Sequence, residues 1–135
     1  MAISKERKNQ LMVWADDVIR NSGIYDDRNK EIVSDSYNGQ IAAFSVSVAL
    51  SGLKPAMALY YSGKGSSDVD KKEIVKLLAA MYSKEIGSQK SADADAFFRQ
   101  VIATNGDALT DLQKKIMEYG IALKLAVRTF KFKEQ

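Results

Sequence analysis

The stretch from Tyr37 to Gly63 constrains the fold of this chain more than any other stretch. It is the densest apolar region and contains the only proline, Pro55. Its first half carries apolar residues every three or four positions, the period of one helix face: Ile41, Phe44 and Val48. Gly52 then predicts a helix end, because glycine adopts the left-handed backbone conformation at little steric cost. We therefore predict a helical hairpin with its corner at Gly52.

Proline fits the first turn of the second hairpin helix, because its missing N–H would have no partner there. The apolar stripe of this helix follows at Ala56, Leu59 and Tyr60. Strand is the alternative for residues 44–48, which alternate apolar and small polar side chains. The neighbouring alanines favour helix, and no turn chemistry supplies a partner strand. We therefore predict helix on both sides of the corner.

The same periodicity predicts the rest of the chain as helix. The hairpin's first helix begins near Lys30 or Ser34. Further helices are expected from about Ser4 to Asn21, from Lys71 (after a cap at Asp70) to about Tyr82, from Ser91 or Asp93 to Asn105, and from about Ala108 to Phe132. With 135 residues the chain buries about two-thirds of its unfolded surface. The prediction is an all-α single domain over residues 1–135, a compact bundle of about six helices with a long final helix.

Two residues have predicted packing roles. Trp14 lies within the apolar stripe of the first helix, which favours a core anchor over a base-stacking residue. Gly39 lies inside the helix before the corner and weakens it by about 1 kcal/mol relative to alanine. It is a candidate for the close approach of another helix.

The composition excludes several kinds of chemistry. The chain has no cysteine and no histidine, so His/Cys metal sites and Ser-His or Cys-His nucleophile pairs are excluded. The pair Asp26-Asp27 is interpreted as a solvated turn, since no third oxygen ligand follows at calcium-loop spacing. The segment 63–67 lacks the residue order of a phosphate-binding loop. We expect no catalytic residue, no cofactor, no metal, no membrane-spanning segment and a cytoplasmic location.

Positive charge is concentrated at the end of the chain. Residues 109–135 contain six bases against three acids, which is the whole net charge of +3. The final helix has a core seam at three-four spacing: Leu109, Leu112, Ile116, Tyr119, Leu123, Ala126 and Phe130. Beside this seam, Lys124, Arg128 and Lys131 fall on one arc, followed by a second apolar stripe at Ile121, Leu125 and Phe132. This cross-section is typical either of a helix contacted from more than one side or of a deeply embedded helix with snorkelling lysines.

Two segments resemble a known family. They are residues 51–65, with Ser51-Gly52-Leu53, Ala56, Ala58, Leu59, Tyr60 and Gly63-Lys64-Gly65, and residues 119–130, YGIALKLAVRTF. The chain is similar over about residues 33–132 to the small all-helical subunit of the type III-B CRISPR effector, the Cmr complex. The resemblance implies a non-catalytic scaffold subunit in antiviral defence. Several copies would stack beside the guide–target duplex, contacting RNA, each other and neighbouring subunits.

The candidate nucleic-acid-binding residues are cations. Lys124, Arg128 and Lys131 come from the final helix, and Lys64 and Lys54 from the hairpin region, since phosphate contact needs charge and reach rather than a motif. One alternative is a helical protein–protein interaction module with no nucleic-acid role. The other is a small carboxylate-dependent enzyme, which would need acids to converge: Asp16, Asp17, Asp26, Asp27 and Asp107.

Overall fold

The computed structural model describes residues 4–22, 32–62, 71–87 and 93–133, with the side chains of 32–36 and 131–133 left out. Six α-helices make up most of this part. They are α1 (Lys5–Arg20), α2 (Asp35–Ser51), α3 (Leu53–Ser62), α4 (Lys71–Ile86), α5 (Ala94–Ala103) and α6 (Gly106–Val127). Two three-residue strands, β1 (Ile32–Ser34) and β2 (Lys131–Lys133), pair in parallel. The predicted all-α bundle is confirmed.

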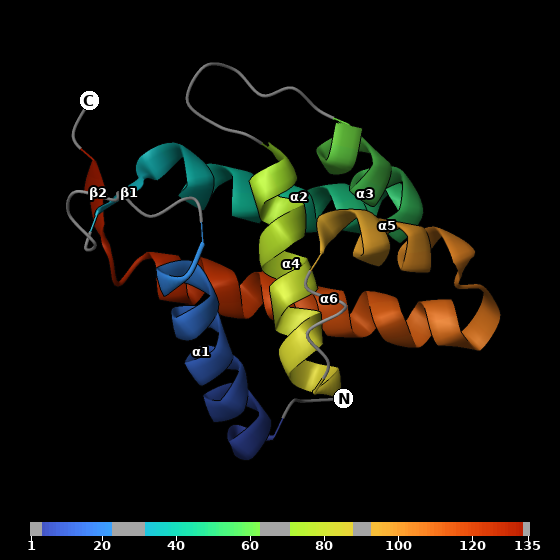
Figure 1. The fold of residues 1–135 in the computed structure, drawn as a ribbon, viewed down its shortest axis with the longest axis horizontal. Helices are drawn as coiled ribbons and strands as arrows, with labels where there is room; N and C mark the ends of the chain where they lie inside the picture. The colour runs from blue at the N-terminus through green and yellow to red at the C-terminus, as the bar shows by residue number, and fades with distance from the viewer. Residues whose placement is uncertain (1–3, 23–31, 63–70, 88–92, 134–135) are drawn as a thin grey trace.

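Helix α4 stands across the middle of the molecule, in front of α2 and α6 (Figure 1). Helices α2 and α6 pack together and run in opposite directions, because β1 leads into α2 and its partner β2 follows α6. Helix α1 packs on α4 and α6, whereas α3 and α5 cover the other end. The largest fully buried side chains come from α1 to α6 and form one core, including Phe44, Tyr119 and Phe97.

The hairpin is formed as predicted. Gly52 has a φ of +91°, and its N–H donates to the Val48 carbonyl at 2.8 Å. Pro55 lies in the first turn of α3. The Phe44 and Tyr60 rings then meet edge to face with centroids 5.2 Å apart, which joins α2 to α3. The strand alternative for residues 44–48 is wrong, because that segment is the middle of α2.

Helix caps and lengths agree with the sequence in most places. Ser4 Oγ accepts from the Arg7 N–H at 3.1 Å and caps α1, and Asp93 caps α5 through the Asp95 N–H. Helix α4 continues past its predicted end at Tyr82 to Ile86. Trp14 packs partly buried against the core. The predictions for Asp26-Asp27, Asp70 and Lys64 lie outside the described residues.

The end of the final helix was predicted wrongly. Helix α6 stops at Val127 instead of Phe132. The Phe130 N–H donates to the Val127 carbonyl at 3.2 Å, and Thr129 Oγ1 donates to the Ala126 carbonyl at 2.7 Å. The chain then enters β2, where the backbone of β1 supplies a parallel partner. A tertiary pairing with a segment about 100 residues earlier therefore overrides local helix propensity.

Candidate partner-binding face

Helix α2 is apolar on both sides. No charged residue lies between Asp35 and Lys54. One side is buried, through Tyr37, Ile41, Phe44 and Val48. The opposite side is exposed and carries Gly39, Ala43, Val46 and Leu50, with Val46 57% and Leu50 82% exposed. A helix that is apolar all round is normally buried, so its exposed side is a candidate contact surface.

Helix α6 has an exposed apolar side of its own. Its predicted core seam is confirmed, with Ile116, Tyr119 and Leu123 fully buried and Leu109 partly buried. Two residues of the predicted second stripe are exposed on the helix, with Ile121 at 54% and Leu125 at 48%. The third, Phe132, belongs to β2 and not to the helix.

These two exposed sides belong to neighbouring helices that pack against each other. A Cβ on Gly120 would lie 2.7 Å from Ser45 Oγ, so α6 and α2 approach closely at this point. The prediction that Gly39 permits close packing is wrong, because nothing lies within 4 Å of a Cβ built there. We define the α2–α6 face as the outward residues of both helices around this contact, the half-buried Lys124 and the C-cap Arg128 included: Gly39, Ala43, Val46, Leu50, Lys114, Ile121, Lys124, Leu125 and Arg128.

The charge on the α2–α6 face is positive. Two nearby carboxylates of α6 are already paired: Asp111 lies 3.2 Å from Lys115 Nζ, and Glu118 lies 2.9 Å from the Arg7 guanidinium. Within the described part of the chain, no carboxylate pairs with Lys114, Lys124 or Arg128. The face therefore combines aliphatic side chains with cations that have no carboxylate partner in that part.

Three of the predicted basic residues, Lys124, Arg128 and Lys131, come from the chain at or next to one end of this face, but they do not share one helical arc. Lys124 is half-buried in the last turn of α6, and Arg128 is exposed at its C-cap. Lys131 belongs to β2, beyond the end of the helix. The predicted arc is therefore wrong in geometry. The three residues remain close in the chain, at the end of the molecule where α2 begins (Figure 1). We call them the basic end.

The ammonium group of Lys54 makes hydrogen bonds within the protein. It donates to the Ile102 carbonyl at 2.7 Å and to Asn105 Oδ1 at 3.0 Å. It thereby ties the start of α3 to the turn between α5 and α6. Lys54 therefore has a structural role within the protein, which its charge alone did not predict.

The sequence did not indicate a charged cluster that joins α1, α4 and α6. Arg7 donates to both oxygens of Glu85, at 2.6 and 2.7 Å, and to Glu118 at 2.9 Å. The Tyr119 hydroxyl donates to Glu85 Oε1 at 3.0 Å. The hydrogen bonds from Arg7 lower the pKa of Glu85, whereas burial raises the pKa of Tyr119. We call these four residues the Arg7 cluster.

Three acids of the enzyme alternative lie in the described part of the chain, and they do not form a cluster there. Asp16 pairs with Arg20 at 2.9 Å, and Asp17 pairs with Lys84 at 2.6 Å, both on the surface. Asp107 lies in the first turn of α6, and Asp26 and Asp27 lie outside the described residues. The described residues include no cluster of three or more acids that could hold a metal ion.

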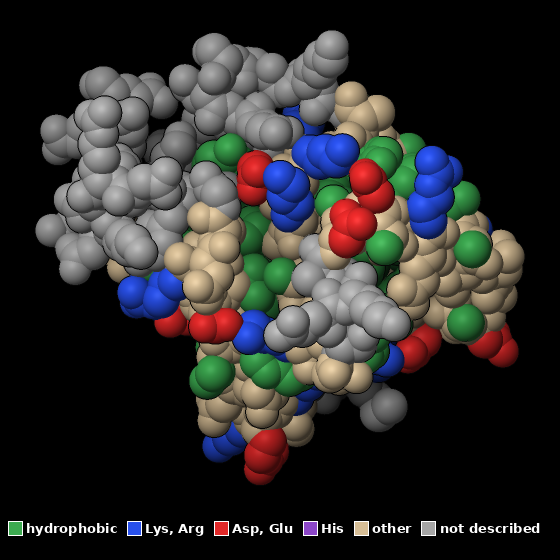
Figure 2. All heavy atoms as spheres, in the orientation of Figure 1, with side chains coloured by type: hydrophobic (Ala, Val, Ile, Leu, Met, Phe, Trp, Pro, Cys, Tyr) green, Lys and Arg blue, Asp and Glu red, His purple; other side chains and the backbone are tan. Residues whose placement is uncertain are grey.

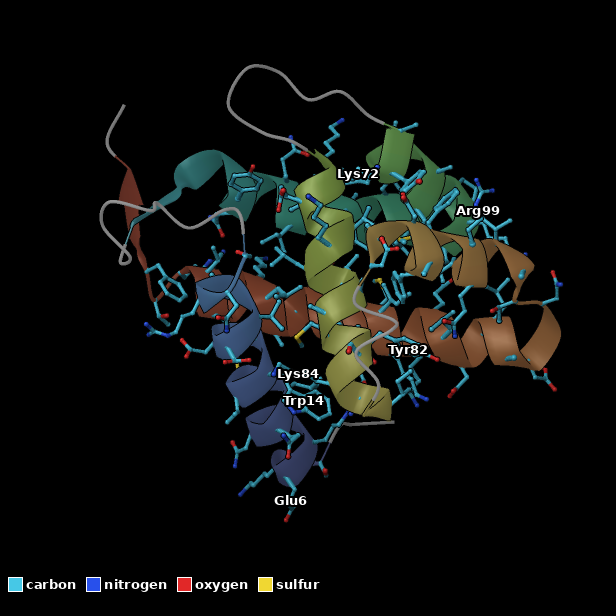
Figure 3. All side chains as sticks on the ribbon, in the orientation of Figure 1. Glu6, Trp14, Lys72, Tyr82, Lys84 and Arg99 are labelled. Atoms are coloured by element: carbon cyan, nitrogen blue, oxygen red, sulfur yellow. The ribbon has the colours of Figure 1, made fainter. Side chains whose placement is uncertain are left out.

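A second candidate site is a groove of about 970 Å³ between α1, α4 and α5. It is lined by charges of both signs, which include the ion pairs of Lys76 with Glu73 at 3.0 Å and of Lys72 with Asp95 at 3.5 Å. Figure 2 shows basic and acidic side chains interleaved on this side of the molecule. Figure 3 places Lys72 and Lys84 toward opposite ends of α4. A ligand here would have to displace ion pairs, unlike a ligand on the α2–α6 face.

No helix in the described ranges is long and apolar enough to span a bilayer. Comparisons with protein-family models, curated proteins and solved structures give no match.

Proposed function

We propose that this protein is a non-catalytic scaffold subunit of a CRISPR RNA-guided effector, similar to the small subunit of the Cmr complex. The observation that carries the proposal is the α2–α6 face, where exposed aliphatic side chains adjoin cations without carboxylate partners in the described part. A scaffold needs both properties, because protein neighbours cover apolar surface and phosphates bind cations. The choice of the Cmr complex rests on the resemblance of residues 51–65 and 119–130 to its small subunit.

The two ends of the face suit different partners. Around the basic end, the outward residues of α2 are small, Gly39 and Ala43, and a Cβ built on Gly39 meets nothing within 4 Å. A phosphate backbone can approach closely there and meet Lys124, Arg128 and Lys131. Contacts of this kind are indifferent to sequence and weaken with salt. Guide or target RNA is the proposed ligand, with Lys64 as a further candidate.

Absence of catalysis is part of the proposal. Glu85 is a partly buried carboxylate, and Arg7 holds it in the charged form with a pKa below its usual value. A general acid at neutral pH needs the opposite shift. The proposed work of the chain is thus to bind and to position, in the cytoplasm, as one of several subunits.

Co-purification tests the proposal. The tagged chain, expressed in its own host, is expected to bring down the other subunits of one effector together with CRISPR-derived RNA, identified by mass spectrometry and RNA sequencing. Recovery of protein partners without RNA would favour the alternative, a helical protein–protein interaction module. The exposed Val46 and Leu50 are the observation behind that alternative.

A further inference from the structure

The half of the α2–α6 face away from the basic end has a different chemistry. Because α2 and α6 run in opposite directions past the Ser45–Gly120 contact, residues after Ser45 lie level with residues before Gly120. At 1.5 Å per residue along the helix axis, Leu50 lies roughly 7–9 Å from Ser45, and Lys114 lies roughly 7–9 Å from Gly120. Both lie on the side of the contact that is away from the basic end. Val46 and Ile121 lie close to the contact itself. We call Val46, Leu50, Ile121 and Lys114 the apolar half.

The side chains of the apolar half match one kind of partner. Val46, Leu50 and Ile121 are all at least half exposed and are aliphatic, so they offer neither charge nor a ring on which a base could stack. The apolar face of a third helix can pack against the outward aliphatic side chains of two neighbouring helices. These features favour a protein helix over RNA.

The positive charge of Lys114 favours a partner helix that carries acidic residues beside its apolar face. Lys114 is exposed, and within the described part no carboxylate pairs with it. At 100° per residue, Lys114 lies within about 20° of Ile121 on the same side of α6, two turns away. A helix lying across Val46, Leu50 and Ile121 would thus bring its flank beside this cation. A second copy docked through the same surface would instead bring two such cations together.

We propose that the apolar half of the α2–α6 face binds an amphipathic helix of another protein, with an aliphatic stripe and acidic flanks. The inference rests on the proposed scaffold function for the existence of such a partner, and it adds the chemistry of that partner. Binding buries the three aliphatic side chains, and an acidic residue of the partner pairs with Lys114. The basic end stays available to RNA.

The absence of cysteine allows a direct test in the full chain. Leu50→Cys, labelled with an environment-sensitive fluorophore, reports burial of the apolar half. Val13→Cys on α1, also exposed and outside the face, is the matched control. The probes are three synthetic amphipathic helices with the same leucine stripe and with glutamate, glutamine or lysine flanks.

We expect the glutamate peptide to shift the emission at Leu50→Cys to shorter wavelength and to leave Val13→Cys unchanged. It should bind about threefold to tenfold more tightly than the lysine peptide, and Lys114→Glu should remove that preference. Circular dichroism confirms that each variant is folded. No response to the glutamate peptide, or an equal response at Val13→Cys, overturns the proposal.

Further titrations of the labelled Leu50→Cys protein test whether another kind of partner binds the apolar half. Concentration-dependent burial of the Leu50→Cys label without peptide indicates a second copy, and a response to vesicles of anionic lipid indicates a membrane surface. A response to RNA alone indicates nucleic acid. Each of these results contradicts the proposal. RNA binding through the basic end is measured separately, with Lys124, Arg128 and Lys131 changed, so either hypothesis can fail while the other stands.

Discussion

The Arg7 cluster and the α2–α6 face use charge in opposite ways. In the cluster, one guanidinium is shared by two carboxylates, and a buried tyrosine hydroxyl completes the network. On the face, Lys114, Lys124 and Arg128 have no carboxylate partner in the described part, and aliphatic side chains stand in solvent. Paired, partly buried charge joins helices, and removing one partner of such a pair is destabilising. Unpaired charge beside exposed apolar surface contributes little to folding and is available for binding.

Removing Arg7 should have the largest effect on stability. Arg7→Met leaves Glu85 and Glu118 partly buried without the guanidinium that bonds both, so the free energy of unfolding should fall by about 2–3 kcal/mol. Urea denaturation measures it. Lys5→Met on the exposed side of the same helix is the control and should change it by less than about 0.5 kcal/mol. Equal effects would show that the cluster does not join the three helices.

The next largest effect on the free energy of unfolding is expected from a core side chain of α2, compared with a side chain of the α2–α6 face. Val48→Ala, at a fully buried position of α2, should lower the free energy of unfolding by about 2 kcal/mol. Leu50→Ser, two residues later on the exposed side, should change it by less than about 0.5 kcal/mol. A large loss for Leu50→Ser would mean that this side chain is needed for folding and is not free for a partner.

The contact between α2 and α6 predicts a double-mutant result. Gly120→Ala places a Cβ against Ser45 Oγ and should destabilise the protein by about 1 kcal/mol. In a Ser45→Ala background the same change should cost nothing, or even stabilise the helix by up to about 1 kcal/mol. Gly39→Ala, with open space around it, should stabilise the wild type. Additive effects of the Gly120 and Ser45 changes would contradict the close approach.

Acid should weaken the cluster before it affects the face. The pKa of Glu85 is lowered in the folded protein from a usual value of 4.5. The stability that this shift contributes is therefore complete above pH 4.5 and is lost as pH falls through the lower, folded pKa. Glu85→Gln should flatten this acid dependence of the free energy of unfolding, measured by urea denaturation between pH 6 and pH 3 in roughly half-unit steps. An unchanged slope would place the titrating group elsewhere.

Local sequence signals predicted the helices and the core well. Apolar spacing identified the hairpin, the seam of α6 and the second stripe at Ile121 and Leu125, because each depends on neighbours within one helix. The exposure of that stripe comes from the structure alone. Features that depend on distant segments were missed. β2 needs β1, the Arg7 cluster joins α1 to α6, and Lys54 is occupied by the α5–α6 turn.

Glycine shows the same limit at the α2–α6 contact. Gly39 and Gly120 both lie inside helices, but only Gly39 is predicted from the sequence as a site of close packing. The structure shows that Gly120 is the one that a neighbouring side chain approaches. Nothing in the local pattern distinguishes the two. RNA binding by the basic end likewise depends on the partner that faces it, and no local pattern in the sequence specifies that partner.

The salt dependence of RNA binding by the assembled complex tests the central claim most directly. Lys124, Arg128 and Lys131 are changed together to glutamine, and affinity is measured over a range of salt concentrations. Removing one cation that binds a phosphate should reduce the slope of log affinity against log salt by nearly one. The matched control is Lys5→Gln with Lys8→Gln on α1. We predict a shallower slope for the triple variant alone, with unchanged thermal stability of the free subunit. An unchanged slope in a fully assembled complex would contradict RNA binding at the basic end.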